Sequence, residues 1–133
     1  MKGLGIHILA EFYGCDAHLL NNSDYIKLVI EEATKKAGAT LITSFSHNFS
    51  PYGVTGIAVI AESHLSIHTW PEYEYAAVDV FTCGESADPY AAFRYIKEKL
   101  KAKDVEIKKI VRGKIKYVVS AHNLKTSYLG KPT

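Results

Sequence analysis

The chain has 133 residues, of which 47% are hydrophobic and 23% are charged, and its formal net charge is +2. These values are typical of one globular domain, and no apolar run approaches the ~18 residues that a transmembrane helix needs. We therefore expect a single domain over residues 1–133 that has no membrane partner.

Hydrophobic periodicity predicts six strands and two helices in chain order. Apolar or alternating runs of strand length occupy residues 5–13, 40–49, 54–70, 76–82, 105–111 and 115–119, and polar residues interrupt the third run near position 62. One helix is expected over 23–36, with Asn22 or Ser23 as its cap, and a second helix opens at Asp88-Pro89. The order strand, helix, strand, strand occurs twice. This order predicts an α+β fold, a two-layer α/β sandwich with both helices on one face of an antiparallel sheet.

The first residues of the chain and the number of cysteines bear on the cellular compartment. Residues 1–7 are too short and too polar for a signal peptide. Two cysteines, Cys15 and Cys83, are too few for the disulfide framework of a small secreted protein. We therefore expect a cytoplasmic protein.

Positive charge is distributed unevenly along the chain. No Lys or Arg lies between Lys36 and Arg94, an interval that holds six acidic residues, whereas ten basic residues lie between 94 and 116. Few aromatic residues interleave with the basic stretch, so we interpret it as a solvated face and expect no nucleic-acid partner. A region without fixed cations suits a positively charged ligand.

The most unusual segment runs from Glu62 to Glu72, with Cys83 beyond it. It places a hydroxyl at Ser63 and imidazoles at His64 and His68 in a stretch that otherwise has the pattern of a buried strand. A hairpin folded about residue 73 would bring Cys83 opposite Ser63, although no Asn-Gly turn fixes the register. This combination of groups indicates an active site.

The residues alone leave three interpretations open. His64, His68 and Cys83 could hold zinc in a non-catalytic α+β module, but no His-Glu-x-x-His motif accompanies them. A Ser-His hydrolase would need the Gly-x-Ser-x-Gly elbow, which Ser63 lacks. Exposed strand histidines and a small buried cysteine are also the commonest fate of such residues taken singly.

The segment from Glu62 to Glu72, together with residues 81–84, resembles the self-processing site of the small prokaryotic S-adenosylmethionine decarboxylases. Residues 10–13, 38–40, 51–56 and 88–89 fit the same family, so that the resemblance covers roughly residues 3–104 in order. The resemblance implies a proenzyme that cuts itself between Glu62 and Ser63, giving chains 1–62 and 63–133. Ser63 would become a covalent pyruvoyl group, with no pyridoxal phosphate and no metal.

The resemblance also implies roles for single residues. His68 would be the proton acceptor in processing, Thr55 would steady the processing intermediate, and Cys83 would donate a proton during decarboxylation. Phe49 would stack on adenine, and Glu72 would accept the ribose hydroxyls. Five residues along a regular strand place Ser63 and His68 on opposite faces, so we expect a bulge or kink near Ser63.

The implied activity is decarboxylation of S-adenosylmethionine through a Schiff base with the pyruvoyl group, which gives the aminopropyl donor for spermidine synthesis. A related branch of the family decarboxylates arginine with the same motif, and the motif does not separate the two cationic substrates. The family likeness further implies a homodimer of cleaved protomers with its sites near the interface.

Overall fold

The computed structural model of the chain describes residues 3–121. Its strands are β1 (Gly5–Tyr13), β2 (Leu41–Asn48), β3 (Val54–Ile60), β4 (Ser63–Trp70), β5 (Tyr75–Cys83) and β6 (Asp104–Arg112). Its helices are α1 (Ala17–Leu20), α2 (Ser23–Lys36), the 3-10 turn η1 (Pro71–Tyr73) and α3 (Pro89–Leu100). None of these helices is long and apolar enough to cross a bilayer.

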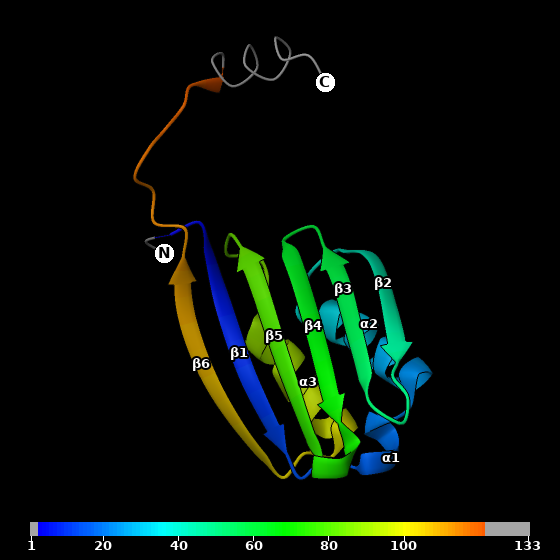
Figure 1. Cartoon of the computed structure of the whole chain (residues 1–133). Coiled ribbons are helices and arrows are strands. Elements are labelled where there is room, and N and C mark those ends of the chain that lie inside the picture. Colours follow the sequence, from blue (N-terminus) through cyan, green and yellow to red (C-terminus); the bar gives the residue numbers. More distant parts are fainter. Residues whose placement is uncertain (1–2, 122–133) are drawn as a thin grey trace.

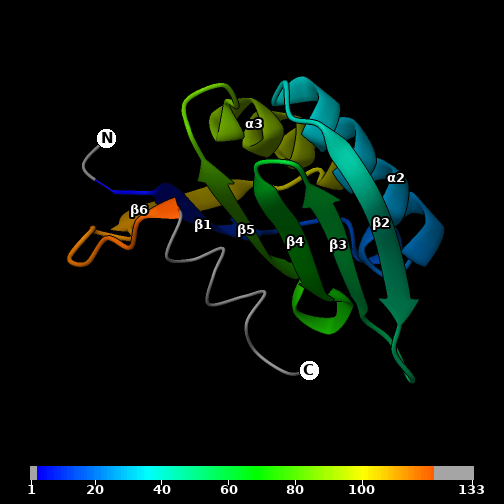
Figure 2. The ribbon, with the colours of Figure 1, turned by 90° about the horizontal axis from the view of Figure 1, so that it is seen from above.

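The strands form one antiparallel sheet in the order β2-β3-β4-β5-β1-β6. Helices α2 and α3 lie side by side against one face of this sheet, and no helix among residues 3–121 covers the other face (Figures 1 and 2). The predicted α+β two-layer architecture is therefore confirmed. We call the uncovered side of the sheet the open face.

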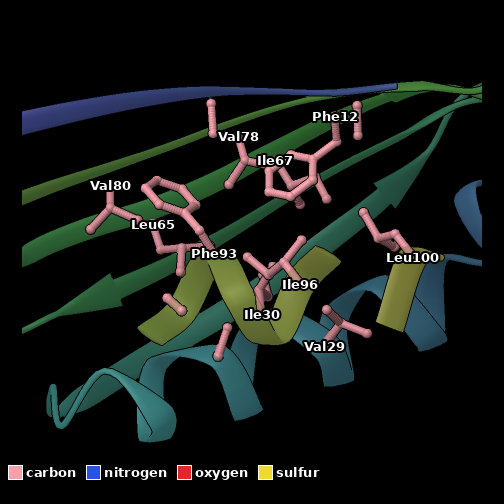
Figure 3. Packing of buried hydrophobic residues seen from close by; sticks show 14 of the residues in the cluster. Phe12, Val29, Ile30, Leu65, Ile67, Val78, Val80, Phe93, Ile96 and Leu100 are labelled. Atoms are coloured by element: carbon pink, nitrogen blue, oxygen red, sulfur yellow. The ribbon is translucent and has the colours of Figure 1, made fainter. Parts of the chain in front are cut away.

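The core lies between the helices and the sheet (Figure 3). Strand residues that alternate toward the helices, such as Phe12 and Ile67, meet Ile30 of α2 and Ile96 of α3, and all four are fully buried. Gly56 allows α2 to lie close to β3, because a Cβ there would come within 3.2 Å of the Ile30 side chain. Burial of these side chains is the main force that holds the two layers together.

Local capping fixes where the two long helices begin. The Asn22 side chain accepts a hydrogen bond from the Tyr25 amide at 3.0 Å, so Asn22, not Ser23, is the cap of α2. Asp88 caps α3 in the same manner, and Pro89 occupies its first turn.

Two of the predicted strands are wrong. Residues 54–70 form two antiparallel strands, β3 and β4, because Ala61 and Glu62 make a tight turn that pairs Ile60 with Ser63. Residues 115–119 are not a strand: their apolar side chains alternate, but the segment leaves the sheet after β6 and has no paired neighbour among the described residues (Figure 1). The layout therefore does not repeat strand, helix, strand, strand in its second half.

The predicted register of the β4–β5 hairpin is wrong by one residue. Ser63 pairs with Thr82, and the Cys83 amide instead donates to the Glu62 carbonyl at 2.9 Å. The cause is the four-residue connection between Trp70 and Tyr75, where Glu74 adopts a left-handed conformation with φ of 51°. Cys83 consequently belongs to the row of β5 residues on the open face.

Candidate active site

Polar groups lie at two opposite ends of β4 and its neighbours. We define the Ser63 end by Glu62, Ser63 and Cys83, at the top of the sheet in Figure 1. We define the His68 end by Thr55, near the start of β3, and His68, near the end of β4. Each end contains some of the predicted site residues.

At the Ser63 end, a tight turn presents the peptide bond between Glu62 and Ser63. The Glu62 carbonyl accepts the backbone amide of Cys83 at 2.9 Å, and the Glu62 carboxylate accepts the Thr40 amide at 3.1 Å. Ser63 has φ of 150°, which a non-glycine residue rarely adopts and which costs on the order of 1–3 kcal/mol. The expected bulge is absent from the β3–β4 pairing, and the irregularity lies in the backbone of Ser63 itself.

At the His68 end, Thr55 and His68 are directly opposite each other on β3 and β4. Thr55 Oγ1 and His68 Nδ1 are 3.0 Å apart, which is hydrogen-bond distance. Both side chains are partly exposed, and both line a cavity of about 310 Å³.

The cavity brings together four predicted residues. Its lining consists of Phe49, Tyr52, Gly53, Val54, Thr55, His68, Thr69, Trp70 and Glu72, and none of these is Lys or Arg. Phe49 is 50% exposed, which excludes a role as a core aromatic residue. A neighbouring hollow shares Tyr52 and Glu72 with it. The cavity is of the size that binds small molecules.

Hydrogen bonds from several elements hold the loop that carries Phe49. The Gly53 amide donates to the Asn21 side chain at 2.9 Å, and the Phe49 amide donates to the Gly53 carbonyl at 2.8 Å. The Val54 amide donates to Thr69 Oγ1, which in turn donates to the Leu20 carbonyl. The short helix α1, which the periodicity did not predict, therefore supports the cavity wall.

Strand geometry separates the two ends. Five residues at a rise of ~3.3 Å each place Ser63 about 16 Å from His68 along β4. Glu62, Ser63 and Cys83 lie together, and Phe49, Thr55, His68 and Glu72 lie together, but one protomer does not bring the two groups into contact.

The two cysteines differ in their surroundings. Both are free thiols; Cys15 is buried and Cys83 is exposed. Burial raises the pKa of the Cys15 thiol to about 11, and the nearby Glu74 carboxylate adds to this effect. Only Cys83 is thus accessible to a bound substrate.

The sequence did not reveal a further cluster on the open face, centred on Asp79. One Asp79 oxygen lies 2.7 Å from His7 Nε2 and 2.8 Å from His64 Nε2, and Ser66 hydrogen-bonds to the other oxygen. Burial would raise the pKa of Asp79, but hydrogen bonds from Ser66, His7 and His64 outweigh it and lower that pKa. In the sequence, the sign of this cluster is Asp79 itself, a single charged residue within the apolar run 76–82.

The same cluster offers metal ligands, because atoms of His7, His64 and Asp79 all lie within 4.8 Å of one another. Arg112, however, donates to His7 Nδ1 at 3.1 Å. With Nδ1 accepting from Arg112, the ring proton of His7 is on Nε2, which donates to Asp79. The alternative zinc set of His64, His68 and Cys83 is not assembled, since His68 lies at the other end of the sheet.

Comparisons with known proteins identify the family. The sequence profile described as S-adenosylmethionine decarboxylase matches residues 6–113. An S-adenosylmethionine decarboxylase proenzyme of Thermosipho africanus is 55% identical over 114 residues, covering 86% of this chain and 88% of that protein. One from Caldicellulosiruptor saccharolyticus is 52% identical over 124 residues, covering 93% of this chain and all of the relative.

A solved structure agrees with these relatives. The adenosylmethionine decarboxylase of Aquifex aeolicus superposes with a TM-score of 0.79 at 41% identity, covering 90% of this chain and 99% of that chain. The chain therefore belongs to the S-adenosylmethionine decarboxylase family.

Proposed function

We propose that this protein decarboxylates S-adenosylmethionine after cutting its own backbone between Glu62 and Ser63. The observation that carries the proposal is the tight turn at the Ser63 end, in a chain of this family. There the carbonyl to be attacked accepts the Cys83 amide, and the following serine holds an unfavourable φ. The cytoplasm remains our prediction for its compartment.

The processing reaction balances with these groups. Ser63 Oγ adds to the Glu62 carbonyl carbon, and the C–N bond breaks to leave an ester. The Cys83 amide is placed to stabilise the developing oxyanion, as backbone donors do in acyl transfer. A base then removes the Ser63 Cα proton, and the main-chain carboxylate of Glu62 leaves as the ester C–O bond breaks. Water hydrolyses the resulting dehydroalanine, releasing ammonia and leaving a pyruvoyl group on residue 63.

His68 is the base that we assign to this step, assisted by the hydroxyl of Thr55. Histidine exchanges protons near neutral pH, and the 3.0 Å contact with Thr55 orients its ring. When present, the pyruvoyl group supplies a carbonyl that condenses with the substrate amine and withdraws electrons as carbon dioxide leaves. Cys83, exposed at the same end as Ser63, then delivers a proton to the substrate carbon.

The cavity at the His68 end is suited to the nucleoside part of the substrate. Phe49 offers a half-exposed ring for stacking, and Glu72 offers a carboxylate to ribose hydroxyls. A sulfonium carries a positive charge, which a lining with Glu72 and without Lys or Arg favours.

A second copy of the chain is needed to complete such a site, because Ser63 and His68 of one protomer are about 16 Å apart. We propose a homodimer whose open faces pack together about a twofold axis that runs across the strands. This axis brings the Ser63 end of one protomer to the His68 end of its partner. The open face also exposes Leu9, Phe45, Val59 and Ile110, which a partner would cover.

Mass spectrometry of the purified protein under denaturing conditions tests the processing. We expect chains 1–62 and 63–133, the second carrying a pyruvoyl group, and a single uncut chain for Ser63→Ala. Release of labelled carbon dioxide from S-adenosylmethionine, and not from arginine, tests the substrate. An uncut wild-type chain with unmodified Ser63 would refute the processing, and release from arginine alone would refute the substrate.

A further inference from the structure

His64 is the first residue after Ser63, and it takes no part in the chemistry proposed above. It lies in β4 between two paired strands, opposite Val59 of β3 and Phe81 of β5. If the chain is cut before residue 63, the pyruvoyl group is attached directly to the His64 amide. Any movement of His64 therefore moves the reacting carbonyl.

Cleavage removes the covalent support of this segment. Before the cut, the turn at Ala61 and Glu62 ties Ser63 to Ile60. After the cut, β4 begins at residue 63, and new chain ends fray unless side chains hold them. The pyruvoyl residue itself has lost its backbone N–H, so residue 64 is the first that can be fastened by both backbone and side chain.

The side chain of His64 is fastened to the middle of the sheet. Its Nε2 lies 2.8 Å from Asp79 Oδ2 on β5, and this same oxygen is 2.7 Å from His7 Nε2 on β1. The Phe81 ring lies 6.1 Å from the His64 ring and 5.3 Å from the His7 ring. The Asp79 side chain is only 19% exposed. Asp79 is therefore a fixed anchor, because it lies on β5 and is hydrogen-bonded to His7 of β1, and the cut touches neither of these strands.

We propose that His64 is a positioning residue for decarboxylation: its hydrogen bond to Asp79 holds the new end of β4, and with it the pyruvoyl group, in place after cleavage. The proposal rests on the proposed function. It predicts that the contact matters much more in the cut chain than in the uncut chain, where the turn already holds β4.

Three variants separate this role from a general structural one. His64→Phe keeps an aromatic ring beside Phe81 but removes the donor, and His64→Gln keeps a donor of similar reach. His7→Phe is the matched control, because it removes the other donor to the same Asp79 oxygen from β1, a strand that stays intact. Each variant is also made in a Ser63→Ala background, which keeps the chain uncut.

We measure cleavage by mass spectrometry, kcat with S-adenosylmethionine, and hydrogen exchange of the β4 amides 65–67. All three single variants are expected to cut themselves. His64→Phe should lose roughly 10-fold in kcat, since small misplacements of a reacting group are costly. Its β4 amides should exchange roughly 10-fold faster than in the cut wild type, but not in the uncut background. His64→Gln should recover most of kcat, and His7→Phe should lose far less.

Several results would overturn the proposal. Cut His64→Phe with wild-type kcat and wild-type protection would show that the tether is not used. Equal loss of protection in the cut and uncut backgrounds, or an equal kcat loss in His7→Phe, would show a merely structural cluster. A wild-type chain that stays whole would instead refute the processing on which the proposal rests, and that outcome is visible in the mass spectrum alone.

Discussion

The Ser63 end and the His68 end of the sheet carry different chemical groups, which we propose serve one reaction. The Ser63 end has the hydroxyl and the carbonyl of the turn before β4, and the exposed thiol at the end of β5. The His68 end has the imidazole, its hydroxyl partner and the cavity. Ser63 and His68 are only five residues apart in the sequence, but they lie near opposite ends of β4. Closeness in the sequence therefore does not bring them together in the site.

Restoring activity by mixing two inactive variants gives the largest expected effect. His68→Ala lacks the base, and Cys83→Ala lacks the proton donor. In a heterodimer with shared sites, one site carries both defects and the other carries neither. Random pairing makes half of the dimers mixed, so coexpression should recover roughly a quarter of wild-type carbon dioxide release, from near zero for each variant alone.

The cleavage pattern provides an independent control for this experiment. About half of the His68→Ala chains should be cut in the mixture, because random pairing gives half of them a partner subunit with an intact His68. Mass spectrometry distinguishes the two chains by mass. If the His68→Ala chain stays whole and no activity returns, each site is built within one protomer, and the division between the two ends is not functional.

The second-largest expected effect is the loss of decarboxylation when Cys83, at the Ser63 end, is replaced. Cys83→Ala removes the thiol but keeps the backbone amide that contacts the Glu62 carbonyl, so cleavage should proceed normally. Decarboxylation should fall by at least ~100-fold, which is typical for loss of a general acid. Cys15→Ala is the matched control, since that thiol is buried. Full turnover by cut Cys83→Ala would remove Cys83 from the reaction.

The sequence predicted the parts of this fold that local chemistry determines. Asn22 and Asp88 cap their helices by accepting hydrogen bonds from amides two or three residues further along the chain. The alternation through Phe12 and Ile67 identified the buried face of the strands. The errors occurred where pairing between strands, and not the local sequence pattern, determines the structure. Alternation at 115–119 does not make a strand without a partner, and the turn at Ala61 and Glu62 lacks an Asn-Gly signal.

The same distinction applies to the site. The resemblance provided the roles of Ser63, His68 and Cys83, but the position of Cys83 relative to Ser63 depends on the four-residue connection after Trp70. The Asp79 cluster joins His7 to a residue 72 positions away, which no local pattern can indicate. Sequence reasoning thus found the chemical groups, and only the strand pairing showed which of them can meet.

The third expected effect is a change in KM when Phe49, in the cavity of the His68 end, is replaced. Phe49→Ala should raise KM for S-adenosylmethionine roughly 10-fold, because stacking of a base on an aromatic ring contributes ~1–3 kcal/mol. Cleavage should be unchanged, since Phe49 does not contact the turn at Glu62. Phe49→Tyr keeps the ring and is the control. An unchanged KM in Phe49→Ala would place the nucleoside elsewhere.

The smallest effect tests how the His68 end orients its base. Thr55→Ser keeps the hydroxyl that lies 3.0 Å from His68 Nδ1, so the rate of cleavage should change by no more than about 2-fold. Thr55→Val has nearly the same shape but no hydroxyl, and it should slow cleavage at least ~10-fold. Both rates are measured by following the uncut chain after rapid synthesis. Equal rates for the two variants would mean that Thr55 only fills space. In that case the His68 ring is oriented by the cavity wall, and the hydroxyl contact has no part in processing.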